Sequence, residues 1–187
     1  MTHETDRLIV ITGGPGSGKT TLIEALAVRG HAVKPEAGRA IIREQQAIGG
    51  TGLPWADRAL FAELMLAADL RSHAEALAGR GLVFFDRGLP DVLGYLALCG
   101  LPVPQQAEQV AQRLRYRHTV FIAPPWRAIF GQDAERKQDF AEAERTYAAL
   151  AETYPRYGYE LVQLPRTSVE ERVAFVLRHA AADGRSG

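Results

Sequence analysis

The chain has 187 residues, of which 47% are hydrophobic and 24% are charged, a composition typical of one globular domain. Its 22 basic and 22 acidic residues give a net charge of +0, which argues against a sequence-independent nucleic-acid binder and an electrostatic membrane anchor. The single cysteine, Cys99, excludes an internal disulfide, and no apolar stretch has the length of a membrane span. We therefore expect a cytoplasmic protein without nucleic-acid or membrane partners. The sequence does not indicate an oligomeric state.

Short apolar runs alternate with longer helical patterns along the chain. The run at 7–12 is continuous and apolar, which is typical of a strand buried on both faces. Strands are predicted at 7–12, 31–34, 82–85, 118–122 and 159–164, and helices at 20–29, 36–47, 55–78, 91–99, 104–117, 139–154 and 168–181. This alternation predicts an α/β fold in which a five-stranded, mostly parallel sheet is covered by helices on both faces. We expect one domain over residues 1–182 and a flexible tail at 183–187.

The glycine-rich turn after the first predicted strand matches the phosphate-binding pattern G-x-x-x-x-G-K-[ST] without a mismatch. Glycines let the backbone approach a phosphate closely, and successive N–H groups at a helix start favour an anion. Lys19 is expected to contact the terminal phosphates, and the Thr20 hydroxyl is expected to ligate Mg²⁺. The pattern predicts that ATP and Mg²⁺ bind at Gly13, Gly14, Pro15, Gly16, Ser17, Gly18, Lys19, Thr20 and Thr21.

Asp86 and Arg87 follow the third predicted strand, and ligands of parallel sheets bind beyond the carboxyl ends of the strands. Asp86 is expected to hold Mg²⁺ directly or through water; the alternative is an aspartate that caps the next helix. Arg87 is expected to reach a phosphate or to orient a carboxylate as a bidentate fork; the alternative is a surface arginine.

Three segments resemble P-loop kinases. Phe84-Phe85-Asp86-Arg87 looks like the Asp/Glu-Arg motif that ends the third strand of deoxynucleoside kinases. The segment 33–39, Val-Lys-Pro-Glu-Ala-Gly-Arg, is similar to the one after their second strand and to the ribosylnicotinamide kinase domain of bifunctional NAD-regulator proteins. Over about residues 7 to 180 the chain resembles the AAA_28 group of small predicted ATPases, and residues 131–140 resemble that group's lid. The resemblance implies a three-layer P-loop NTPase fold with kinase-like strand order and a helical lid at about 125–140.

The resemblance also implies roles for residues after the second and third strands. In the related kinases, the glutamate after the second strand accepts the proton of the attacking hydroxyl, which makes Glu36 the general-base candidate. Arg39 lies one helical turn further on and is expected to bind substrate or to pair with Glu36. The expected substrate-binding residues are therefore Glu36, Arg39 and Arg87, and the expected catalytic residues near the sheet are Lys19, Glu36, Asp86 and Arg87.

In the related kinases the lid carries arginines that close over the transferring phosphoryl group. Arg127 and Arg136 are the catalytic candidates here, with Lys137 and Arg145 in reserve. Cations at this position offset the negative charge that builds on the phosphoryl oxygens. Gly131 and the two residues after it are expected to act as the hinge of the lid.

Three classes of function fit these motifs. The favoured one is Mg²⁺-dependent transfer of the ATP γ-phosphoryl group to a small, nucleoside-like acceptor. The second is a nucleotide-dependent switch or binding module; the chain contains no Asn and no Thr-Lys-x-Asp, which disfavours a Ras-like GTPase but leaves GTP open as a ligand. The third is an oligomeric ATP-driven machine, for which 187 residues leave little room and the transporter signature Leu-Ser-Gly-Gly-Gln is missing.

Overall fold

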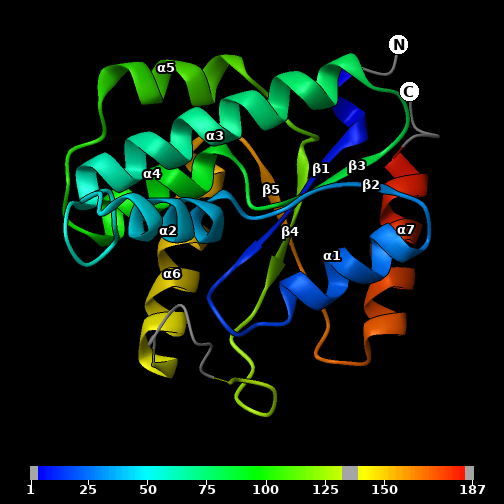
Figure 1. Cartoon of the computed structure of the whole chain (residues 1–187). Coiled ribbons are helices and arrows are strands. Elements are labelled where there is room, and N and C mark those ends of the chain that lie inside the picture. The colour runs from blue at the N-terminus through cyan, green and yellow to red at the C-terminus, as the bar shows by residue number, and fades with distance from the viewer. Residues whose placement is uncertain (1–3, 132–138, 184–187) are drawn as a thin grey trace.

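The computed structural model describes residues 4–131 and 139–183, which form a sheet with helices on both faces (Figure 1). The strands are β1 (Leu8–Gly13), β2 (Ala32–Lys34), β3 (Val83–Asp86), β4 (Thr119–Ala123) and β5 (Glu160–Gln163). The helices are α1 (Lys19–Val28), α2 (Ala37–Ile48), α3 (Arg58–Ala78), α4 (Leu89–Leu98), α5 (Gln105–Arg113), α6 (Phe140–Arg156) and α7 (Val169–Asp183), after a short 3-10 helix at Glu4–Arg7. None of the helices in this part of the chain combines the length and apolar character that crossing a bilayer requires.

The sheet confirms the predicted fold class. Its strand order is β2-β3-β1-β4-β5 and every pair is parallel, the arrangement of P-loop kinases. Strand β1 is central and buried at all six positions, which explains its uninterrupted apolar sequence. Because Ile11 of β1 is paired with Asp86 of β3, the turn after β1 and the residues after β3 emerge side by side at one edge.

Alternate residues of the central strands build two cores, one on each face of the sheet. On one face Ile9 and Ile11 pack with the apolar sides of α1 and α7. On the other face Leu8 and Val10 pack with α3, α4 and α6, and Figure 1 shows these helices grouped on the side away from α1 and α7. Helix α2 packs on α3 through a separate small cluster of Ile41, Ile42, Leu53 and Phe61.

Several predicted ends shift by one to four residues. Helix α3 begins at Arg58 rather than at Trp55, because the Asp57 carboxylate caps it by accepting the Leu60 N–H at 2.9 Å. Helix α5 ends at Arg113 rather than at Arg117, because the chain is already extended at Leu114 on its way to β4. Helix α7 includes Asp183, and residues 184–187 of the predicted tail lie outside the described residues.

Helices α4 and α6 approach closely at Gly94. A Cβ atom there would lie 2.8 Å from Leu150 Cδ2 and 3.3 Å from Thr153 Oγ1. We expect Gly94→Val to destabilise the fold by about 1–3 kcal/mol, because the branched side chain needs space between α4 and α6 that Leu150 and Thr153 occupy. Ala97→Val on the exposed side of α4 is the control and should cost no more than about 0.7 kcal/mol. Urea unfolding measures both, and equal midpoints would contradict the close packing.

Candidate functional site

The phosphate-binding motif forms the turn between β1 and α1. Gly16 and Gly18 have φ values of 66° and 78°, in the left-handed region that favours glycine. Gly14 is needed for a different reason: a Cβ atom on it would lie 2.4 Å from the carbonyl oxygen of Ala143, so the backbone of α6 packs directly behind the turn. Residues 15–21 line a cavity of about 600 Å³, the loop cavity, whereas Gly13 and Gly14 do not line it.

Lys19 is the first residue of α1, and its side chain is buried in the turn. Its Nζ donates to the carbonyl oxygen of Gly14 at 2.7 Å and to Ser17 Oγ at 3.3 Å. Burial lowers the pKa of Lys19 to about 8, and Arg87 contributes in the same direction, while Asp86 and Glu36 oppose the shift. The charge of the Lys19 ammonium therefore depends on its burial and on the charged side chains around it.

Asp86 ends β3 and is buried, with only 5% of its surface exposed. Its Oδ1 has no hydrogen-bond partner within residues 4–131 and 139–183. Burial raises the pKa of Asp86 to about 6, Lys19 counteracts this, and Glu36 adds to it. A divalent cation would satisfy Oδ1 and favour the ionised carboxylate, so Asp86 fits Mg²⁺, and Thr20, which lines the loop cavity, carries a hydroxyl of the kind that can complete such a site.

Arg87 has a φ of 76° and is the one non-glycine residue in the described part of the chain with a positive φ. This conformation is strained for a residue with a Cβ atom and costs about 1–2 kcal/mol. It is held by the Arg87 N–H, which donates to the Ile11 carbonyl oxygen at 3.0 Å. The guanidinium lies between two carboxylates, with Nε 3.2 Å from Glu36 Oε1 and one terminal nitrogen 3.0 Å from Asp91 Oδ1. Although burial opposes its charge, Glu36 and Asp91 raise the pKa of Arg87 above its ordinary value.

Glu36 connects the end of β2 to α2, and its side chain does not cap the helix. The Glu36 side chain is 9% exposed and pairs with Arg87, the residue after β3, as well as with Arg39 Nε at 3.5 Å. Of the two roles expected for Arg39, the structure therefore contains the pairing with Glu36. The three residues lie together at the edge of the sheet, as the sequence predicted from their positions after the strands.

Asp91 joins the site from the first turn of α4, and it is the main residue that sequence reasoning missed. Its Oδ1 accepts from Thr12 at 2.6 Å and from Arg87, and its Oδ2 accepts from the Gly88 N–H at 3.0 Å and from the Tyr154 hydroxyl at 2.5 Å. Asp91 could have been found from the sequence as an acidic residue in the first turn of a helix. Nothing in the sequence around Tyr154, on α6, indicates that it contacts the site.

Of the two predicted lid arginines, Arg127 lies in the described part of the chain, and it does not line the loop cavity at the phosphate turn. Arg127 lies in a turn after β4, where its guanidinium carbon is 4.0 Å from the centre of the Phe140 ring, and it lines neither cavity described here. Residues 125–131 of the expected lid are therefore not helical. Arg136 and Lys137 lie outside the described residues, while Arg145 on α6 lines the second cavity described below.

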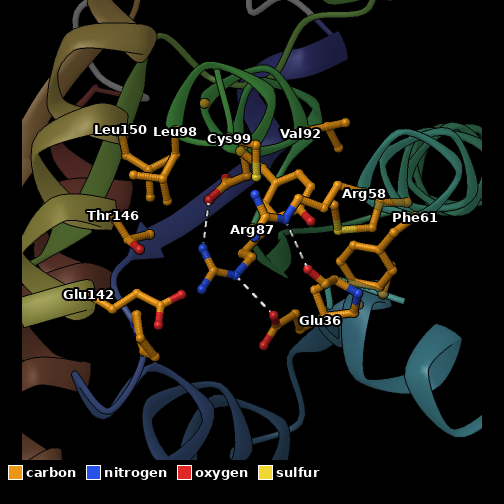
Figure 2. Close-up of a pocket in the computed structure, with 18 of the residues that line it drawn as sticks. Glu36, Arg58, Phe61, Arg87, Val92, Leu98, Cys99, Glu142, Thr146 and Leu150 are labelled. Carbon is orange, nitrogen blue, oxygen red and sulfur yellow. Dashed lines mark hydrogen bonds and ion pairs between the residues drawn. The ribbon is translucent and has the colours of Figure 1, made fainter. Parts of the chain in front are cut away.

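A second cavity of about 580 Å³, the aromatic cavity, adjoins the loop cavity. The two share three lining residues, Pro15, Glu36 and Arg87. Figure 2 shows Arg87 in the middle of the aromatic cavity, with Glu36 on one side and Leu98 and Leu150 on the other. Its apolar lining includes Trp55, Phe61, Met65, Val92, Tyr95, Leu98 and Leu150, and its charged lining comprises Glu36, Arg58, Asp69, Arg87, Asp91, Glu142 and Arg145.

A parallel sheet in this order, with a phosphate turn after its central strand, defines a nucleotide-binding protein of the P-loop kinase fold. The chain belongs to the AAA_28 family, described as an AAA domain, whose model matches residues 8–172. No curated protein sequence matches the chain significantly.

Solved structures with the same fold are kinases and a related protein. A deoxyadenosine kinase from M. mycoides, with dCMP and dCDP bound, superposes with a TM-score of 0.60 at 14% identity, over 94% of this chain and 99% of that chain. The thymidylate kinase from Ehrlichia chaffeensis gives 0.60 at 17% identity, over 92% and 98%. The NadR protein in complex with NR gives 0.67 at 16% identity, over 96% of this chain and 51% of NadR. These likenesses establish the fold.

The pKa of Lys19 leads to a testable pH dependence. Below about pH 8 the Lys19 ammonium is already charged when a triphosphate binds. Between pH 8 and the ordinary lysine pKa of 10.5, the free amine must first take up a proton in order to bind the triphosphate as a cation. ATP affinity should therefore fall above pH 8, by up to about tenfold per pH unit. Calorimetry at pH 7, 8 and 9 with Mg²⁺ and constant ionic strength measures this. Lys19→Met should bind weakly without this dependence, and a wild-type affinity that is constant from pH 7 to 9 would refute the contact.

The position of Asp91 predicts unequal costs for two substitutions in its network. Asp91→Asn removes the buried charge that faces Arg87, and should destabilise the fold by about 3 kcal/mol. Tyr154→Phe removes one of the hydrogen bonds to Asp91 and should cost about 1 kcal/mol. Chemical denaturation compares the two, and a smaller loss for Asp91→Asn than for Tyr154→Phe would show that Asp91 is not the centre of the network.

Proposed function

We propose that this protein transfers the γ-phosphoryl group of ATP, with Mg²⁺, to a hydroxyl group of a small nucleoside-like acceptor. The observation that carries the proposal is the junction of the two cavities at Glu36 and Arg87. A nucleotide in the loop cavity has its terminal phosphate at the turn, and a molecule in the aromatic cavity reaches the same residues from the other side. A second cavity of this size beside the turn has room for a molecule other than the nucleotide, which favours transfer over a switch that only hydrolyses nucleotide.

The loop supplies the nucleotide half of the reaction. Its backbone N–H groups and Lys19 would bind the phosphates, and Lys19 remains near the terminal phosphoryl group as it moves. Thr20 and Asp86 would hold Mg²⁺, which neutralises charge on the phosphate oxygens when it is bound. We assign the remaining loop residues, 13–18 and Thr21, to nucleotide binding.

Glu36 supplies the acceptor half. An alcohol must lose its proton as its oxygen bonds to the γ-phosphorus and the bond from that phosphorus to ADP breaks, and the Glu36 carboxylate would accept this proton. A phosphate acceptor is already ionised near neutral pH and needs no such base. It would also approach the carboxylate of Glu36, whose negative charge disfavours it, so a hydroxyl acceptor is favoured.

Arg87 and Arg39 orient Glu36 in this scheme. The guanidinium of Arg87 fixes one Glu36 oxygen and can contact the transferred phosphoryl group from between the two cavities. We assign Arg127 and Arg136 to the lid at 125–140, which belongs to the single domain of residues 1–182. The Arg127 contact with Phe140 is worth only about 0.5–1 kcal/mol, so a bound triphosphate can compete for this guanidinium.

The proposal is tested by ADP formation with ATP, Mg²⁺ and a panel of nucleosides and nucleoside monophosphates. A nucleoside should stimulate ADP formation, and Glu36→Gln should lower the stimulated rate by about 10²–10⁴ with ATP affinity unchanged. Lys19→Ala should weaken ATP binding strongly, as Lys19→Met should. Glu44→Gln, which changes an exposed carboxylate on the same helix as Arg39, is the control and should keep the wild-type rate.

Two outcomes would contradict the proposal. If no acceptor stimulates ADP formation while ATP causes a large conformational change, the protein is a nucleotide-dependent switch. If Glu36→Gln and Glu44→Gln are equally active, the hydroxyl proton is accepted elsewhere.

A further inference from the structure

Helix α3 forms one wall of the aromatic cavity. It contributes Arg58, Phe61, Met65 and Asp69, whose spacings of three and four residues place them along one side of the helix. Arg58 is exposed at one end of this row and Asp69 is half-buried at the other. At 1.5 Å per residue the row extends for roughly 16 Å, which is long enough to follow a whole small molecule. The open end is at Arg58 and the exposed Trp55, so Asp69 lies at the inner end.

Asp69 has no role in the mechanism proposed above. Within the described part of the chain, no hydrogen bond or ion pair involves its carboxyl group, although it lines a cavity among mainly apolar side chains. Two further carboxylates, Asp91 on α4 and Glu36 before α2, act on it, with Arg87 as the opposing cation and the buried Tyr116 hydroxyl as another neighbour. Burial raises the pKa of Asp69 to about 8, and Asp91 and Glu36 add to the rise.

These surroundings favour one kind of ligand group over another. Asp91 and Glu36 add negative charge near Asp69, which Arg87 partly offsets, and this makes the inner end of the cavity favourable for a positive group. A hydrogen-bond donor can be bound by Asp69 in either protonation state, and a donor that keeps the carboxylate ionised gains a charge-assisted bond. A half-buried carboxyl group, without a hydrogen-bond partner in the described part of the chain, would therefore gain a partner from the ligand.

The aromatic side chains that line the cavity indicate the shape of the ligand that fits beside Asp69. Phe61 and Tyr95 pack edge to face with ring centroids 5.6 Å apart, and Trp55 stands at the mouth. Aromatic side chains bind flat rings, and their faces also attract cations. A cavity of about 580 Å³ accommodates one molecule of nucleoside size.

We propose that Asp69 selects an acceptor whose flat ring carries a hydrogen-bond donor, an amino group or a positively charged ring, at the end remote from the hydroxyl that meets Glu36. This inference rests on the proposed function for the position of the hydroxyl, but the recognition of the ring is a binding property of the aromatic cavity alone.

Binding without ATP tests it, by calorimetry or by tryptophan fluorescence. Adenosine is compared with purine riboside, and cytidine with pyrimidin-2-one riboside, because each pair differs only in the amino group. Ribosylnicotinamide is compared with its neutral dihydro form, which separates ring charge from the amino donor. At least one donor-bearing or charged member should bind about tenfold or more tightly than its partner. Asp69→Asn should bring that ratio close to one, while Glu63→Gln, an exposed carboxylate on the same helix, should leave it unchanged.

The outcomes separate this inference from the proposed function. Equal binding within all three pairs, or a ratio that survives in Asp69→Asn, overturns the role of Asp69. A second variant, Asp69→Leu, must give the same loss of preference, and thermal unfolding of each variant shows that it is folded. A preference that depends on Asp69 without any phosphorylation would support this inference and refute phosphoryl transfer. Phosphorylation without such a preference would support phosphoryl transfer and refute the role of Asp69.

Discussion

The ion pair between Glu36 and Arg87 joins the two halves of this molecule. Glu36 follows an outer strand, Arg87 follows its neighbour, and their contact of 3.2 Å lies where the two cavities meet. The pair is stable because it is not alone: Asp91 balances the second side of the guanidinium and is itself held by Thr12, Gly88 and Tyr154. A buried guanidinium with one carboxylate partner would be held from one side only, and Asp91 supplies a second opposite charge.

The arrangement also explains why Arg87 keeps a strained backbone. The left-handed φ of 76° would suit glycine, but a glycine would leave Glu36 and Asp91 facing the same space without a cation. The energy of the charge network therefore exceeds the cost of the dihedral angle. Strain of this kind is found where the surrounding structure determines one conformation.

What the sequence could predict depends on how local each contact is. The phosphate turn was found because its geometry is set by eight consecutive residues, and Asp86, Arg87 and Glu36 were found because each follows a strand that could be identified. Helix ends were less certain, since the cap of α3 and the early end of α5 depend on single side chains and on the approach to β4.

The rest of the site could not be predicted because it depends on packing between distant segments. The bond from Tyr154 to Asp91 joins residues 63 positions apart, and nothing near either residue specifies it. Asp69 has the same spacing as the apolar row of α3, so its position in the sequence indicates a buried stripe rather than a ligand contact. The lid arginines were inferred from resemblance, and the contact of Arg127 with Phe140 follows from the local turn after β4.

The contact between Gly14 and the backbone of Ala143 has a consequence for how the two cavities respond to each other. Helix α6 rests on the turn at its amino end, and further along it contributes Arg145, Thr146 and Leu150 to the wall of the aromatic cavity. Any displacement of the turn by bound phosphates would therefore be passed through α6 to the wall of the aromatic cavity. With such a displacement, binding to the two cavities is thermodynamically linked, and each ligand changes the affinity of the other by the same factor.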